Sequence, residues 1–173
     1  APRRLTFGAR GTGKTNGVAD YCAQEEMDRY DGFWLSSSAN FLAFEEVDES
    51  HIPLFHIGHP GHPDPAEAET HRYPFAGAAN PKVRLGVVPT SGAPEPIWFD
   101  LTKPFGEDCY LARVSWLTKP EGGEVLLAQV QSRDQRALAL LRLDPTTGTA
   151  ATLMTETAPD LGQGSTWINL HDV

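Results

Sequence analysis

The chain has 173 residues, of which 40% are hydrophobic and 21% are charged. Acidic residues outnumber basic ones by 23 to 14, which gives a formal net charge of -9. Such a charge repels phosphate backbones, so we expect no nucleic-acid partner and favour a cationic ligand. No apolar run approaches the roughly 20 residues of a membrane span, and no signal peptide is recognisable, so we expect no membrane association.

Cysteine usage gives a weak indication of compartment. Cys22 and Cys109 are too few for a disulfide scaffold, and no Asn-x-Ser/Thr glycosylation site occurs. Both features favour a reducing environment. We therefore predict a cytoplasmic location, with a periplasmic one open if the protein is bacterial.

The N-terminal segment predicts a strand, a loop and a helix. Residues 4–7 alternate in polarity and predict a short strand, which a glycine-rich stretch follows at 8–17. Residues Val18 to Tyr30 contain good helix formers and no proline, and Val18, Cys22, Ala23 and Met27 fall near one face. We expect Asp31-Gly32 to end this helix, because glycine suits the residue that follows a helix.

From Phe33 onward the apolar period is two, which predicts strands separated by Pro- and Gly-containing turns. The run 58–80 is rich in Pro, Gly and His and predicts a long loop. The expected strands are 33–35, 41–46, 53–57, 82–88, 97–101, 112–117, 125–130, 137–143 and 151–155.

Two segments echo each other, VRLGVVPTSG at 83–92 and LALLRLDPTTG at 138–148. Each is an apolar strand that ends in a Pro-Thr-x-Gly turn. Repeated strand–turn units of about 40 to 45 residues are typical of the blades of a β-propeller. The predicted fold class is therefore all-β, a partial β-propeller of four-stranded antiparallel blades with one short inserted helix.

The segment Gly8 to Thr15 matches the P-loop pattern G-x-x-x-x-G-K-[ST], in which Lys14 would reach the phosphates of a nucleotide. We interpret this match as accidental. Asn16-Gly17 is a poor first helical turn. The rest of the chain lacks the strand–helix alternation of a parallel sheet. A P-loop nucleotide-binding protein stays an alternative hypothesis.

Other polar groups have plain structural interpretations. His56, His59 and His62, with His51 and His71 nearby, lie in or beside the Pro- and Gly-rich segment, so we expect surface histidines, no metal site and no cofactor. The acidic run 45–49 predicts a solvated rim, with added negative potential near an amine site as the alternative. The tryptophans, expected in the core between blades, are Trp34, Trp98, Trp116 and Trp167.

Glu25 and Glu26 place two carboxylates side by side on the predicted helix. Adjacent like charges disfavour each other unless a cation lies between them. A peptide α-amino group, with a pKa near 8, is such a cation and can share its donors between two carboxylates. From the residues alone, a solvated acidic helix face is the alternative.

Four strings in the chain resemble the propeller domain of the dipeptidyl peptidase IV family, most closely its dipeptidyl peptidase 8 and 9 branch. They are GVADYCAQEEMDRYDGFW, FLAFEEVDESHIPLFHI, HRYPFAGAANPKVRLGVV and TWINLHD, with Tyr73, Pro74, Gly77, Asn80 and Pro81 in the third. The chain departs from the family at Phe33-Trp34, where two tryptophans are usual. The resemblance implies that Glu25 and Glu26 project from a short helix and hold the free N-terminus of a peptide substrate.

The resemblance also implies that residues 1–173 are a fragment of an N-terminal β-propeller domain. No G-x-S-x-G nucleophile motif occurs in them, so we expect no catalytic residue here and place the catalytic α/β-hydrolase domain elsewhere in the parent. The parent is expected to be a serine dipeptidyl peptidase that removes dipeptides with Pro or Ala second. This chain would recognise the substrate and gate access. A homodimer is a further expectation, and a non-catalytic interaction module is the alternative.

Overall fold

The computed structural model describes residues 2–61, 64, 67–92, 95–159 and 166–170. Within these residues it contains eleven strands and one helix. In chain order they are β1 (Lys14–Asn16), α1 (Tyr21–Glu26), β2 (Phe33–Leu35), β3 (Phe41–Asp48), β4 (Leu54–Ile57), β5 (Glu69–Arg72), β6 (Lys82–Pro89), β7 (Ile97–Phe99), β8 (Cys109–Thr118), β9 (Glu124–Ser132), β10 (Ala137–Leu143) and β11 (Ala150–Thr157).

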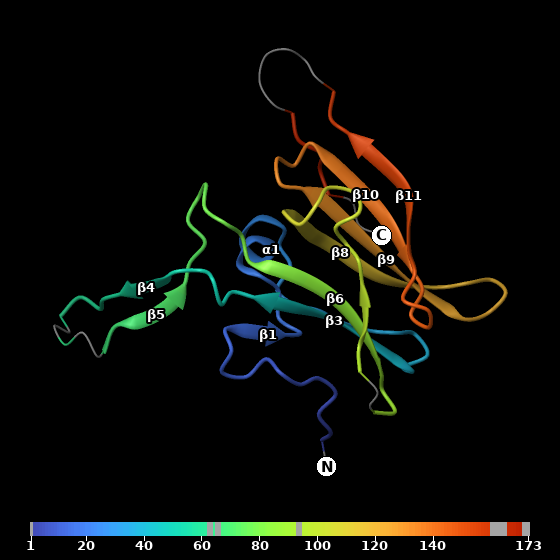
Figure 1. Ribbon diagram of the computed structural model, residues 1–173, viewed down its shortest axis with the longest axis horizontal. Coiled ribbons are helices and arrows are strands. Elements are labelled where there is room, and N and C mark those ends of the chain that lie inside the picture. The colour runs from blue at the N-terminus through green and yellow to red at the C-terminus, as the bar shows by residue number, and fades with distance from the viewer. Residues whose placement is uncertain (1, 62–63, 65–66, 93–94, 160–165, 171–173) are drawn as a thin grey trace.

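The first sheet has five strands in the order β1-β3-β6-β7, with β2 also paired to β3. All of its pairs are antiparallel. β1 pairs with residues 46–48 of β3 and β2 with residues 42–44, so the two short strands continue one another along β3. Residues 17–32, which include α1, are therefore an insertion within one edge of this sheet (Figure 1).

Two glycines form a narrow neck at the base of the insertion. Gly17 N–H donates to the carbonyl of Glu45 at 2.8 Å, and Glu45 N–H donates to the carbonyl of Gly32 at 2.7 Å. Gly17 has a φ of +79°, and a Cβ on Gly32 would lie 2.7 Å from the backbone of Val18. Only glycine fits both positions, so the sequence sets where the chain leaves the sheet and returns to it.

The second sheet is a four-stranded antiparallel meander in the order β11-β10-β9-β8. Its last turn is built by Asp144, whose carboxylate accepts hydrogen bonds from the backbone N–H groups of Thr146 and Thr147. This Asx-type turn explains the Asp-Pro-Thr-Thr-Gly sequence. The meander confirms the prediction of four-stranded antiparallel blades.

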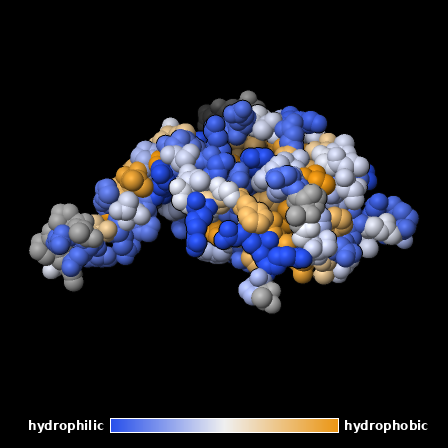
Figure 2. Space-filling model, turned by 60° about the horizontal axis from the view of Figure 1, so that its bottom comes forward, coloured by the Kyte–Doolittle hydropathy of each residue, from blue (hydrophilic) through white to orange (hydrophobic). Residues whose placement is uncertain are grey.

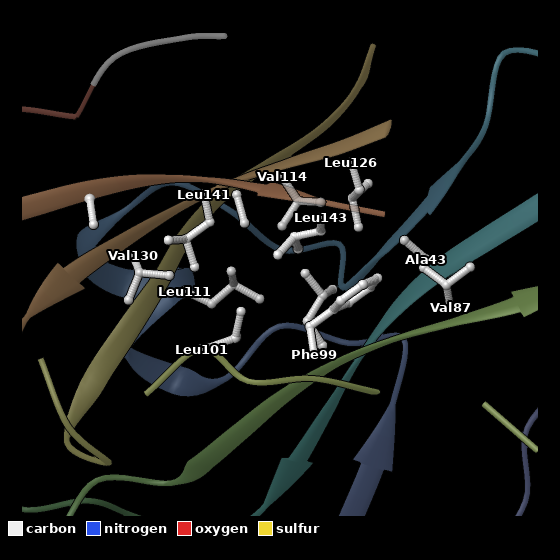
Figure 3. Packing of buried hydrophobic residues seen from close by; sticks show 13 residues of the cluster. Ala43, Val87, Phe99, Leu101, Leu111, Val114, Leu126, Val130, Leu141 and Leu143 are labelled. Atoms are coloured by element: carbon white, nitrogen blue, oxygen red, sulfur yellow. The ribbon is translucent and has the colours of Figure 1, made fainter. Parts of the chain in front are cut away.

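The main hydrophobic core lies between the two sheets (Figure 3). It joins Ala43, Leu85, Val87 and Phe99 of the first sheet to apolar residues of the second. Those residues are Leu111, Val114, Leu126, Ala128, Val130, Ala139, Leu141 and Leu143, with Leu101 between the sheets. Burial of this surface fixes the relative position of the sheets, and with it the platform on which the inserted helix lies.

The hairpin β4–β5 projects from the rest of the molecule as an arm, at the left of Figures 1 and 2. Its existence corrects the prediction that residues 58–80 form a loop throughout, because β5 lies inside that range. At the base of the arm, Phe55, Tyr73 and Phe75 pack edge-to-face or tilted, with ring centroids 5.0–6.1 Å apart. These rings are partly exposed.

Three further expectations need correction. Residues 4–7 form no strand, because the described structure gives them no ladder partner. The helix spans only Tyr21–Glu26 instead of 18–30: Val18 pairs with Asp31 in an isolated bridge, and Asp28 has a φ of +50° that no helix continues through. Trp167 is 66% exposed and is not a core residue.

The acidic run 45–49 is not a solvated rim at its first two positions. Glu45 is fully buried and Glu46 is 8% exposed, because β3 is covered on both faces there. Each of the two carboxylates has cationic partners, described below. No helix among the described residues is long and apolar enough to span a membrane.

Candidate functional site

The helix α1 begins at an N-cap that the sequence supplies directly before it. The carboxylate of Asp20 accepts hydrogen bonds from the backbone N–H groups of Cys22 at 2.9 Å and Ala23 at 3.3 Å. Asp20 is itself buried, so the cap holds the start of the helix against the body of the protein. Asp is among the preferred N-cap residues because it satisfies N–H groups that lack a helical partner.

One face of α1 packs on the second sheet. Ala23 and Met27 are buried together with Ala112 of β8 in a small apolar cluster that also includes Ala19. Tyr110 and Leu170 lie against this cluster. Because Ala23 and Met27 are four residues apart, they share the buried face. Glu25 and Glu26, which lie between them in the sequence, are exposed.

Two arginines hold the C-terminal end of the helix. Arg113 of β8 donates to the carbonyl of Met27 at 2.8 Å. Arg29 donates through Nη2 to the carbonyl of Leu111 at 2.8 Å and through Nη1 to the carbonyl of Asp31 at 3.0 Å. The carbonyls at the end of a helix have no partners within it, so Arg113 satisfies one of them, while Arg29 ties the residues after the helix to β8 and to the returning chain.

The Arg29 side chain also forms a buried ion pair with Glu45 of β3, with Nη1 and Oε2 2.5 Å apart. Arg29 is 8% exposed and Glu45 is fully buried. Burial raises the pKa of Glu45 to about 7 despite the attraction of the guanidinium. The Arg29 guanidinium also lies over the ring of Trp34, 5.5 Å from its centroid. One side chain therefore connects the inserted segment with both sheets.

Glu25 and Glu26 are positioned as an accessible acidic pair. Within the described part of the chain, neither carboxylate accepts a hydrogen bond or forms an ion pair. Glu25 lies close enough to Tyr21, one turn earlier, to influence its ionisation. Glu26 lines a pocket of about 280 Å³ with Asp28, Arg113, Trp167 and other residues. The two carboxylates therefore provide negative charge that no ion pair within the described residues neutralises, although Arg113 lines the same pocket as Glu26.

The segment Gly8–Thr15 does not have the geometry that a P-loop needs. Lys14 and Thr15 belong to strand β1, and the next helix begins only at Tyr21. The Lys14 ammonium lies 3.3 Å from Glu46 and 3.5 Å from Asp48, both on β3. A phosphate site at a helix N-terminus requires the helix to start directly after the loop, and here an antiparallel strand follows it.

The histidines of the arm contact groups near them on the hairpin. Glu69 lies 3.4 Å from His59 and 3.0 Å from His71, and His56 Nδ1 lies 2.9 Å from the hydroxyl of Thr70. His62 lies outside the described residues. No cluster of three or more His, Cys, Asp or Glu in the described ranges is arranged to hold a metal ion.

The sequence predicts Glu25 and Glu26 as the site but does not point to the residues that hold their helix in place, namely Asp20, Arg29 and Arg113. Asp20 could have been found, because an Asp directly before a run of helix formers is a standard N-cap signal. Arg29 carries no such signal: its partners Glu45 and Leu111 are 16 and 82 residues away in the sequence.

Comparison with known proteins gives a consistent result. The family model for the dipeptidyl peptidase IV N-terminal region matches residues 1–173. Dipeptidyl peptidase 8 of Mus musculus is 29% identical over 199 residues, which cover 92% of this chain and 21% of that protein. Prolyl endopeptidase FAP of Homo sapiens is 33% identical over 92 residues, which cover 52% of this chain and 12% of that protein.

The fold has counterparts among solved structures. The crystal structure of Porphyromonas gingivalis dipeptidyl peptidase 4 matches with a TM-score of 0.75 and 23% identity, over 88% of this chain and 21% of that one. The chain spans about a fifth of the length of dipeptidyl peptidase 8. The antiparallel blades, the inserted helix and the match along all 173 residues lead to one conclusion: the chain belongs to the dipeptidyl peptidase IV family, as part of its N-terminal β-propeller region.

Proposed function

We propose that this chain is the substrate-recognition part of a serine dipeptidyl peptidase, in which Glu25 and Glu26 bind the protonated N-terminus of a peptide. We assign the bond cleavage to an α/β-hydrolase domain of the same protein, with a serine nucleophile activated by histidine. Membership of the dipeptidyl peptidase IV family supports the peptidase assignment. The propeller would also control which peptides reach that domain.

The observation that carries the proposal is that two neighbouring carboxylates, on a firmly held helix, have no hydrogen-bond or ion-pair partner among the described residues. Some other carboxylates of the chain have cationic or hydroxyl partners, such as Asp108 with Arg133 and Glu124 with Ser38. Glu25 and Glu26 have neither within the described residues. An ammonium group carries three donors and a positive charge, so it can bind both carboxylates at once through charge-assisted hydrogen bonds.

An amine anchor of this kind also limits the length of the released product. If the N-terminus is held at Glu25 and Glu26, the scissile bond lies where the extended chain reaches the nucleophile. Two residues span roughly 7 Å of extended chain, since each contributes at most ~3.3–3.6 Å. A fixed distance between the acidic pair and the nucleophile would therefore select release of dipeptides over longer fragments.

The test is an assay of the full-length parent protein with a Gly-Pro chromogenic substrate. Glu25→Gln and Glu26→Gln keep the side-chain shape and remove the charge, and Glu121→Gln, at an exposed turn between β8 and β9, is the matched control. A hydrogen bond to a charged group contributes ~1.5–3 kcal/mol, so each site variant should lower kcat/KM by about 10- to 100-fold.

A des-amino analogue of the same substrate, which lacks the charged N-terminus, completes the test. Its kcat/KM should be equal in the wild type and all three variants. Wild-type activity of both site variants on the free-amine substrate would refute the anchoring role. A parent protein that hydrolyses neither substrate would favour a non-catalytic interaction module instead.

A further inference from the structure

We propose that Arg29 is a positioning residue for substrate binding: it sets the orientation of Glu25 and Glu26 by joining the end of their helix to both sheets. The inference rests on the proposed function of the acidic pair. It assigns a role to a side chain that does not itself face the substrate, because Arg29 is 8% exposed.

The helix is short and needs external support. α1 has six residues, and isolated helices below about 12 residues are marginal in water. Its end is closed by two backbone hydrogen bonds to one carbonyl, since both Met27 N–H and Arg29 N–H donate to Ala23 O, at 3.2 and 3.1 Å. The backbone of Arg29 thus ends the helix, and its side chain determines where that end lies.

The guanidinium reaches three elements at once. It contacts the carboxylate of Glu45 on β3, the carbonyl of Leu111 on β8 and the carbonyl of Asp31 in the returning chain. Leu111 lies next to Ala112, on which the buried face of α1 packs, so this hydrogen bond fixes the helix against β8. A lysine has a single ammonium group and cannot reproduce the planar fork that reaches both Glu45 and Leu111.

Arg29 has two roles, and a different contact carries each: the ion pair with Glu45 and the hydrogen bond to Leu111. The pair with Glu45 neutralises a buried charge, which is a matter of stability. The hydrogen bond to Leu111 joins the inserted segment to the second sheet, which is a matter of position. Replacing both partners of a buried ion pair is often tolerated, so Arg29→Met combined with Glu45→Gln removes the positioning contact without leaving an unpaired buried charge.

The experiment measures KM, kcat and thermal stability in the full-length parent protein with the free-amine substrate and its des-amino analogue. The variants are Arg29→Met/Glu45→Gln and Arg29→Lys, with Arg142→Met on the exposed face of β10 as the matched control. Both Arg29 variants should raise KM for the free-amine substrate about tenfold or more, because small displacements of binding groups are costly. The kcat/KM for the des-amino analogue should not change.

A comparison in the Glu25→Gln/Glu26→Gln background shows whether Arg29 acts through the acidic pair. There, the Arg29 variants should cause no further rise in KM. Wild-type KM in Arg29→Lys, equal losses on the two substrates, or additive losses in this background would each overturn the positioning role. If Glu25→Gln and Glu26→Gln have wild-type activity while Arg29 variants do not, the proposed function itself fails and this inference fails with it.

Discussion

The indole N–H of Trp116 on β8 donates to the backbone carbonyl of Trp34 on β2 at 2.9 Å. This hydrogen bond joins the two sheets, and Trp116 also stacks on Phe41, with ring centroids 6.2 Å apart. A half-buried tryptophan thus serves both as apolar packing and as a directed contact.

Trp116→Phe should therefore lower stability more than its change in apolar surface suggests. The substitution removes the indole N–H that donates to the carbonyl of Trp34, and a hydrogen bond of this kind contributes ~1 kcal/mol. The thermal midpoint of the protein measures the effect. Trp167→Phe is the control, since Trp167 is 66% exposed and its N–H donates to the neighbouring Asn169 side chain. Equal midpoint shifts for the two variants would contradict the prediction.

Asp20→Ala should destabilise the protein by about 1 kcal/mol, because the two N–H groups at the start of α1 lose their acceptor. Asp20→Asn keeps an oxygen in the same place and should recover most of the loss. Denaturation midpoints of both variants, measured under one condition, provide the comparison. If Asn and Ala are equally destabilising, the cap does not act through these hydrogen bonds.

The buried carboxyl of Glu45 should make stability depend on pH. Its pKa is raised from 4.5 to about 7, so the folded state binds the proton more tightly than the unfolded chain does. The contribution of Glu45 is therefore fully present below pH 4.5 and is lost as pH rises through 7. Relative to Glu45→Gln, the wild type should lose stability on the order of 2 kcal/mol between pH 5 and pH 8.

The measurement for Glu45 is the difference in denaturation midpoint between wild type and Glu45→Gln at several pH values. Using the difference removes the titration of other groups, which the two proteins share. A difference that stays flat from pH 5 to pH 8 would show that Glu45 titrates at its ordinary pKa, and one that changes in favour of the wild type would show a lowered pKa. Either result contradicts the prediction.

Lys14→Ala should have no effect on nucleotide binding. Lys14 is part of a strand, and its ammonium is neutralised by Glu46 and Asp48. The loss of this partly exposed pair should cost less than about 1 kcal/mol of stability. Labelled ATP with and without Mg²⁺ tests the first point. Mg²⁺-dependent binding by the wild type that disappears in the variant would revive the nucleotide interpretation.

The strands that sequence analysis placed well have local causes. Residues 137–143 were predicted with the observed bounds, because apolar alternation ends at an Asp-Pro-Thr-Thr-Gly turn whose hydrogen bonds are all short-range. β5 was missed for the opposite reason. Its residues, Glu69 to Arg72, are polar and mostly exposed, and only backbone pairing with β4 makes them a strand.

The surroundings of the candidate site depended on long-range contacts and were less predictable. The burial of Glu45 could not be read from an acidic run, since it depends on Arg29 reaching across from the insertion. The early end of α1 follows from the positive φ of Asp28 and from the glycine neck, neither of which helix propensity detects. The role of Glu25 and Glu26 stays a prediction.

The six-residue length of α1 has a consequence for the order in which the protein folds. A helix this short does not form alone, and its supports come from Glu45 on one sheet and from Leu111 and Arg113 on the other. Glu25 and Glu26 are therefore presented side by side only after both sheets have formed and come together. Folding intermediates would lack the acidic pair in its final geometry. The ability to bind peptide N-termini would therefore arise late in folding and would indicate that the two sheets have packed together.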